Sequence, residues 1–233
     1  MRTRNLLHPS ARTGLGGFTA PDLMALIAIL SVLGAVVAVP LIRSKRSAGE
    51  AVCVNNLRQI AQAVNLYAED HGKTLPGPVA GQAGDFWWWY KEQIRPYPKP
   101  KGDRAAQDAQ FVCPSDRGYS DPAPFSKTQR FDFSSYVFNG VTLPGMPQIA
   151  GWKQSALVEP AKTLVVMEWA AHAPISWHRS RTGLKNTPFY NNAACAVSFT
   201  DGHAAVIPIY YDGFNAAYTR DPIAGYAYRY SGN

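Results

Sequence analysis

The stretch GFTAPDLMALIAILSVLGAVVAVPLI, residues 17–42, is the most informative part of this 233-residue chain. Its residues 23–42 carry no charge over about twenty positions, the length that an α-helix needs to cross the hydrocarbon core of a membrane. Asp22 stands immediately before this run, where a carboxylate is costly in lipid unless it has a partner. The stretch therefore predicts a membrane-spanning helix with an acidic residue at its start.

Three interpretations of this segment stay open on composition alone: a plain membrane anchor, a secretory signal peptide, and a leader that is cut before the apolar helix. Val36-Val37-Ala38 offers the small residues of a secretory cleavage site, with a new N-terminus near Val39. The basic residues ahead of the run are Arg2, Arg4 and Arg12. The basic residues behind it are Arg43, Lys45 and Arg46. Because the two sets are equal in number, the flanking charge does not predict the orientation.

The flank Gly16-Gly17-Phe18-Thr19-Ala20-Pro21-Asp22 resembles the type IV prepilin signal, which is a basic leader, a glycine, a cut, a phenylalanine and an acidic fifth residue. The resemblance implies that a prepilin peptidase cuts between Gly17 and Phe18, that the new amino group is methylated, and that Asp22 serves in assembly. In such filaments a carboxylate gains a charge pair with a neighbour's N-terminus in a low dielectric. Asp22 replaces the usual glutamate, and Pro21 before it is tolerated in a first helical turn.

The helix is expected to continue beyond the apolar run, from Phe18 to His71. Apolar residues recur at helical spacing along this second part: Cys53, Leu57, Ile60, Val64 and Tyr67. Gly72 and Pro76 supply a stop. The sequence thus predicts a helix that is apolar all round in its first half and amphipathic in its second.

Three motifs resemble a subgroup of pseudopilins: Cys-x-x-Asn-Leu-Arg-Gln-Ile at 53–60, Cys-Pro-Ser-Asp at 113–116 and Ser-Tyr-x-x-Asn at 135–139. The resemblance implies a Cys53–Cys113 disulfide. The subgroup ends in an Asp-Gly hairpin with a histidine ten positions before the aspartate, and here Asn191 takes that place. Cys195, in an apolar strand, is expected to be a small buried hydrophobe.

The rest of the chain reads as short strands and turns. Residues 163–168 predict one strand, and residues 194–207 predict a hairpin that turns at Asp201-Gly202. We therefore expect an α+β fold, a long N-terminal helix packed on a small antiparallel sheet, which the resemblance extends to the pilin-like lollipop. The expected organisation is a leader at 1–17, a transmembrane and polymerisation helix at 18–42, an amphipathic continuation at 43–72 and a globular head at 73–233. The Tyr-rich tail, 210–233, has no interpretable motif.

No motif in the sequence points to an enzyme. The chain has no nucleophile elbow, P-loop, dinucleotide fingerprint or zinc-protease spacing, and its cysteines form no C-x-x-C pair. Residues that could converge on a metal are Glu168, His172, His178, Asp201 and His203. The resemblance favours calcium over zinc, because many pilin-like heads bind calcium through loop carboxylates and carbonyls. The candidate carboxylates are Asp116, Asp121 and Asp132. No cofactor is expected to be required.

Two expectations concern partners. The net charge of +7 comes without a basic stripe interleaved with aromatic residues, so nucleic acid is not an expected partner. The resemblance implies a prepilin peptidase, other pilin-like subunits and the inner membrane, crossed once, with the head outside the cytoplasm. The alternative is an anchored or secreted binding protein that contacts glycan or protein through the Trp87–Trp89 cluster, although a core role for those rings is favoured.

Overall fold

A computed structural model of the chain describes residues 17, 19–79, 86–97, 108–118, 123–172, 175–179, 189–214 and 217–233. The chain divides into two units, Met1–Ser44 and Lys45–Asn233. Helix α1 (Ala20–Asp70) runs through the boundary between them. The amphipathic part of α1, from Lys45 on, therefore belongs to the same unit as residues 73–233.

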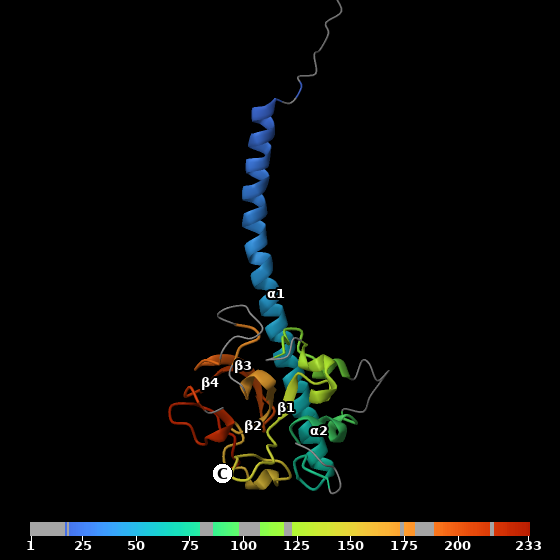
Figure 1. Cartoon of the computed structure of the whole chain (residues 1–233). Helices are drawn as coiled ribbons and strands as arrows, with labels where there is room; N and C mark the ends of the chain where they lie inside the picture. The colour runs from blue at the N-terminus through green and yellow to red at the C-terminus, as the bar shows by residue number, and fades with distance from the viewer. Residues whose placement is uncertain are drawn as a thin grey trace, which may run out of the picture. The chain divides into compact units, whose positions relative to one another are not determined.

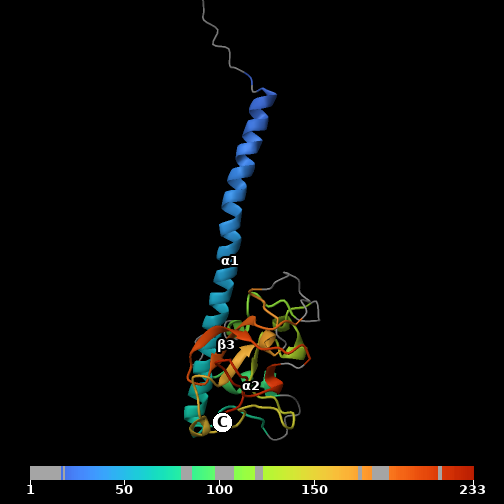
Figure 2. The same cartoon turned by 90° about the vertical axis from the view of Figure 1, so that its left-hand side faces the viewer.

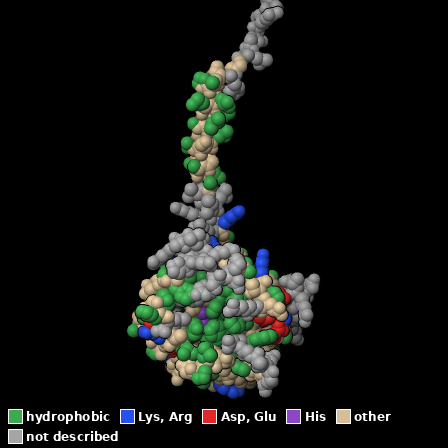
Figure 3. Space-filling model, viewed as in Figure 1, with side chains coloured by type: hydrophobic (Ala, Val, Ile, Leu, Met, Phe, Trp, Pro, Cys, Tyr) green, Lys and Arg blue, Asp and Glu red, His purple; other side chains and the backbone are tan. Residues whose placement is uncertain are grey.

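The first part of α1 is apolar and uncovered. Residues Ala20–Ala38 are long and apolar enough to cross a membrane, and none of them is buried in the structure. Its large side chains are between 42% and 73% exposed, and Figure 3 shows them along this part of the helix. Phe18, where the sequence predicts the helix to begin, lies outside the described residues. The structure thus has one described helix with the length and composition that a membrane span requires.

The second part of α1 presents one buried stripe to the head. Cys53, Leu57, Ile60 and Val64 are fully buried and belong to the same hydrophobic core as the strands, as the helical spacing predicted. Figure 2 shows this part of α1 alongside the sheet. The helix ends at Asp70, and Gly72 follows with a φ of 61°, a conformation in which a residue without Cβ ends a helix at little cost.

The head is built on a four-stranded antiparallel sheet in the order β1-β2-β3-β4 (Figure 1). The strands are β1 (Tyr136–Phe138), β2 (Leu164–Glu168), β3 (Ala193–Phe199) and β4 (Ala204–Ile209). Every residue of β1 and β2 is buried. Because successive side chains of a strand point to opposite faces, both faces of these strands must be covered. The chain thus combines a long helix with a small antiparallel sheet, which is the α+β class that the sequence predicted.

The β3–β4 hairpin forms as expected, with a longer turn. The Phe199 N–H donates to the His203 carbonyl at 2.9 Å, so the connection runs from Thr200 to His203 instead of through a two-residue loop. Gly202 has a φ of 97°, which explains the glycine. The edge strand β4 contains Pro208, whose missing N–H suits an edge and discourages further strand pairing.

The Tyr-rich tail is part of the core. Tyr228 and Tyr230 are buried, and the Leu164 N–H donates to the Arg229 carbonyl at 3.0 Å, beside the start of β2. The Asn139 side chain, in the Ser-Tyr-x-x-Asn motif, donates to the carbonyl of Tyr230 at 2.7 Å. The tail is therefore attached to the sheet by its backbone as well as by its rings, although its sequence contains no motif that predicts this.

Candidate functional site

The predicted processing site lies at the start of α1. Gly17 is exposed, and a Cβ placed on it would meet nothing within 4 Å. Asp22 accepts hydrogen bonds from the backbone N–H of Thr19 at 3.0 Å and from its hydroxyl at 2.6 Å. A capping box has two reciprocal hydrogen bonds, and this is the one from the N-cap amide, here that of Thr19, to the side chain three residues later. It satisfies an amide that the helix leaves unpaired. Asp22 therefore caps its own helix, a role that the sequence analysis missed, although Thr19 three residues before it was a sufficient signal.

The disulfide that the resemblance implied is present. Cys53, on α1, and Cys113, in the segment before β1, are joined with their Cα atoms 5.2 Å apart. Both residues are almost completely buried. A Cβ on Gly49, one helical turn before Cys53, would come within 2.9 Å of the Ser115 hydroxyl, so this glycine lets the Cys-Pro-Ser-Asp segment approach the helix. Cys195, buried and not in a disulfide, lies in β3, where burial raises the pKa of its thiol.

The motifs that carried the resemblance form one hydrogen-bonded network around this disulfide. Asp116 accepts from the Ser135 hydroxyl at 2.8 Å, and Ser135 Oγ accepts from the Cys113 N–H at 2.9 Å. The Asn56 side chain, on α1, donates to the Val112 carbonyl at 3.0 Å. Buried polar groups need such partners to offset their desolvation. The motif residues thus hold the segment of Cys113 against α1.

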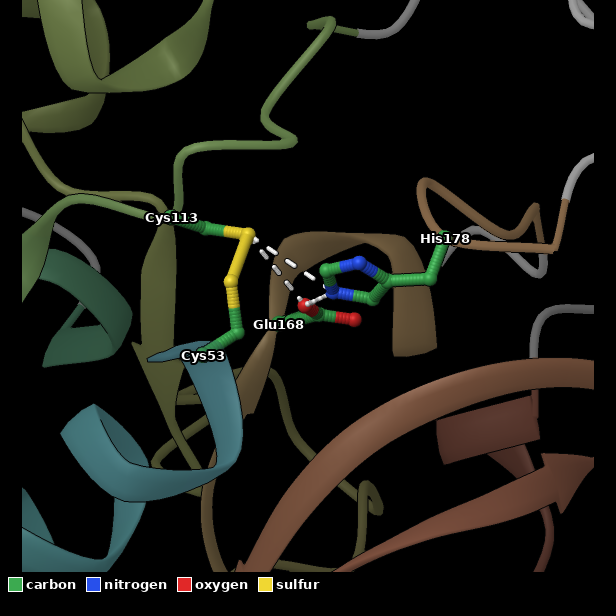
Figure 4. A group of neighbouring side chains, drawn as sticks. All are labelled: Cys53, Cys113, Glu168 and His178. Carbon is green, nitrogen blue, oxygen red and sulfur yellow. Dashed lines mark hydrogen bonds and ion pairs between the residues drawn. A yellow bond between two sulfur atoms is a disulfide. The ribbon is translucent and has the colours of Figure 1, made fainter. Parts of the chain in front are cut away.

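A buried carboxylate and a buried imidazole lie against the disulfide (Figure 4). Glu168 Oε1, at the end of β2, is 2.7 Å from His178 Nε2. The Sγ of Cys113 lies 3.5 Å from that Oε1 and 3.7 Å from that Nε2. The other carboxylate oxygen, Oε2, accepts from the Ala196 N–H at 2.9 Å. One oxygen of Glu168, Oε2, is therefore held by an amide of β3, and the other, Oε1, faces the Cys113 sulfur.

An ion pair holds the segment that carries His178. Arg179 donates two hydrogen bonds to Glu50 on α1, from Nε at 2.9 Å and from Nη2 at 2.7 Å. These bonds lower the pKa of the Glu50 carboxyl. The Arg179 side chain is largely exposed, so the pair contributes little to stability, but its two-point geometry fixes the position of the neighbouring histidine.

Of the five side chains considered for a metal, Glu168 and His178 lie in one buried cluster, and the other three lie elsewhere. His172 lies among rings, with its centroid 4.6 Å from that of Trp87 and 4.9 Å from that of Tyr218. Asp201 and His203 pair with each other at 2.6 Å in the exposed hairpin turn. Within the described ranges, one group of three or more ligand side chains has its atoms within 4.8 Å of one another: Cys53, Cys113, Glu168 and His178.

The pH dependence of stability is expected to depend on His172. Neither of its ring nitrogens has a hydrogen-bond partner among the described residues, and burial lowers the pKa of His172 to about 3. Between pH 6.5 and about pH 3, the unfolded chain binds a proton at His172 that the folded chain does not. Stability should therefore fall as the pH falls, by about 1.4 kcal/mol per pH unit from this residue.

The measurement is the free energy of unfolding at pH 6.5 and at pH 5 for the wild type and for His172→Phe. The variant should lose about 2 kcal/mol less than the wild type over this interval. His71→Phe, the same change at an exposed histidine, is the control for replacing a histidine with a phenylalanine as such. Equal slopes in all three proteins would contradict the assignment.

The calcium expectation stays a prediction. Asp116 already accepts the N–H groups of Gly118 and Ser126 besides the Ser135 hydroxyl. Asp132 pairs with the buried Lys91 at 3.2 Å. Asp121 lies outside the described residues. The two described carboxylates are therefore engaged by donors of the chain itself.

The tryptophan cluster is mostly part of the core. It lies on α2 (Phe86–Ile94), and Trp87 is 7% exposed. Trp88 packs on Phe131, with the ring centroids 5.4 Å apart. Trp89 is 42% exposed. Of the three indoles proposed as a contact surface, one is therefore well exposed, which favours the core interpretation of this stretch.

The comparisons with known proteins identify no relative: no family model matches the chain, and no curated protein and no solved structure matches it.

Proposed function

We propose that this protein is a structural subunit, pseudopilin or pilin-like, of a filament of the type II secretion or type IV pilus kind. A prepilin peptidase removes the leader after Gly17, and the mature chain polymerises through the apolar part of α1. The head lies outside the cytoplasm, and the chain crosses the inner membrane once. This work is mechanical and needs no active site.

The observation that carries the proposal is the pairing of the cleavage motif with an uncovered apolar helix. The described side chains of Ala20–Ala38 are all exposed, and apolar surface of this extent is unfavourable in water. Lipid covers it before assembly, and the helices of other subunits cover it afterwards. A plain anchor accounts for the lipid stage, but it gives no reason for a Gly-Phe pair followed by an acidic residue in the first helical turn.

The mature N-terminus tests the proposal. We expect mass spectrometry of the protein purified from its host's membranes to find a chain that starts at Phe18, with a methylated amino group. A start near Val39 would establish a secretory signal instead, and an intact Met1 would establish a plain anchor. Either result would refute processing by a prepilin peptidase.

Asp22 has two roles in this proposal, and two substitutions separate them. Asp22→Asn keeps a side-chain oxygen for the Thr19 amide but removes the charge that pairs with a neighbour's N-terminus. Thr19→Ala removes one partner of the cap and keeps the charge. Both variants should be cleaved normally, but only Asp22→Asn should reduce assembly, measured as the fraction of subunits in sheared or sedimented filaments. Normal assembly of Asp22→Asn would leave Asp22 with the capping role alone.

A further inference from the structure

The buried cluster at the disulfide contains two cysteine sulfurs, a carboxylate and an imidazole. Zinc sites commonly use three or four ligands of these types. Cys53 lies on α1, Cys113 before β1, Glu168 at the end of β2 and His178 in the segment 175–179. All four are buried, and Figure 4 shows their side chains directed toward one another. We propose that the reduced chain binds Zn²⁺ at this cluster, through both thiolates, the carboxylate and the imidazole, and that the disulfide and the metal are alternative states of one site.

The disulfide-bonded state does not explain why the two polar side chains of the cluster, Glu168 and His178, are buried there. Burying a carboxylate and an imidazole costs several kcal/mol of desolvation, and apolar residues of similar volume are commonly as stable or more so. Glu168 and His178 nevertheless lie at the core of the head, against a disulfide that gains little from either. In the reduced state both side chains become ligands, and their position beside the sulfurs is explained.

The distances from the Cys113 sulfur fit a tetrahedral ion, and two other separations in the cluster must widen. In a zinc site, a sulfur ligand lies about 3.6 Å from a nitrogen or oxygen ligand, and two sulfurs lie about 3.8 Å apart. The Cys113 sulfur is already 3.5 Å from Glu168 Oε1 and 3.7 Å from His178 Nε2. The contact between Oε1 and Nε2, at 2.7 Å, must open by about 0.6 Å. The two sulfurs must separate from bonding distance once their bond is broken.

Groups around the cluster hold two of the four ligands, Glu168 and Cys113, in place. The Ala196 N–H fixes the outer oxygen of Glu168, so the inner oxygen faces the sulfurs. The Cys113 N–H is bonded to Ser135, which is bonded to Asp116. Such outer contacts orient metal ligands and raise affinity. The network that the motifs form would thus serve either state of the site.

The chemistry balances with a dithiol reductant. The reductant supplies two electrons and two protons, the S–S bond breaks, two thiols form, and the reductant closes its own disulfide. Zn²⁺ then displaces both thiol protons to solvent, and neutral His178 binds through Nε2 with its ring proton on Nδ1. Before the disulfide forms, a newly made chain already carries the two thiols. The proposal does not depend on filament assembly.

The test compares the full chain in detergent micelles with its disulfide intact and after reduction by a phosphine in denaturant and refolding with Zn²⁺. We expect about one zinc per reduced chain and almost none per oxidised chain. Co²⁺ should replace Zn²⁺ and give the visible bands of a tetrahedral ion together with a thiolate charge-transfer band. Reduced chain that takes up no metal, or that stays unfolded by circular dichroism in excess Zn²⁺, would overturn the proposal.

Matched variants identify the ligands. His178→Gln should weaken zinc binding by at least about tenfold, since changes that merely surround a metal site already cost that much. His172→Gln, at an equally buried histidine outside the cluster, should not weaken it. Cys113→Ser should reduce the thiolate band, whereas Cys195→Ser should leave it unchanged. Equal zinc affinity in both histidine variants, or equal bands in both cysteine variants, would show adventitious thiol binding and refute the site.

Discussion

Replacing Cys53 and Cys113 with alanine is expected to lower the free energy of unfolding of the oxidised protein by about 4 kcal/mol. The disulfide joins residues 60 positions apart, so it removes a large part of the conformational entropy of the unfolded chain. It also connects α1 to the segment before β1, which the Asn56 side chain reaches through a hydrogen bond to the Val112 carbonyl. Denaturant unfolding of the head, followed by circular dichroism, measures the effect.

Cys195→Ala is the control for this change, because it removes a buried sulfur without breaking a crosslink. It should cost about 1 kcal/mol. If the double variant loses no more than twice as much as this control, the lost sulfur atoms explain the whole effect. The disulfide would then contribute nothing through the unfolded state.

Replacing Gly17 with leucine is expected to abolish removal of the leader. A peptidase that cuts directly after a glycine must accommodate that residue closely, and a branched side chain occupies the space that the glycine leaves. The substitution does not disturb the fold, because a Cβ at Gly17 meets no atom within 4 Å. The unprocessed precursor should accumulate in the membrane, detected by its mass and by its unchanged N-terminus.

Gly34→Leu is the matched control, since Gly34 also has open space around it but lies within the apolar part of α1. That variant should be processed like the wild type. Normal maturation of Gly17→Leu would refute the assigned cleavage site. Failure of both variants would point to a general defect in membrane insertion and would also remove the support for the site.

The sequence predicted the elements whose patterns are local. The stripe on α1 and the Asp-Gly hairpin follow from periodicity and turn chemistry, and both appear where expected. The length of the β3–β4 turn did not follow, because the backbone pairs Phe199 with His203, and the Asp201 side chain accepts the His203 N–H inside the loop. The tail was not predicted at all. Its order comes from backbone bonds to the start of β2, which leave no periodic trace in residues 210–233.

The candidate site was predicted in pieces. The cysteine pair came from a resemblance, and Glu168 and His178 were named among residues that could converge. Because the cysteines form no C-x-x-C pair, a thiolate metal site had no local support in the sequence. That argument applies to sites built from one short segment. Here the groups come from a helix, a loop, a strand end and a further segment, so only the packed core brings them together.

The Cys53–Cys113 bond also determines how the protein responds to force. A pull along α1 would load the packing of its buried stripe and the covalent bond together. The covalent bond lies near the beginning of the stripe and passes the tension directly into the segment before β1. A helix anchored in this way cannot be drawn out of the head while the bond is intact. The force needed to draw α1 out of the head is therefore expected to fall when the disulfide is reduced.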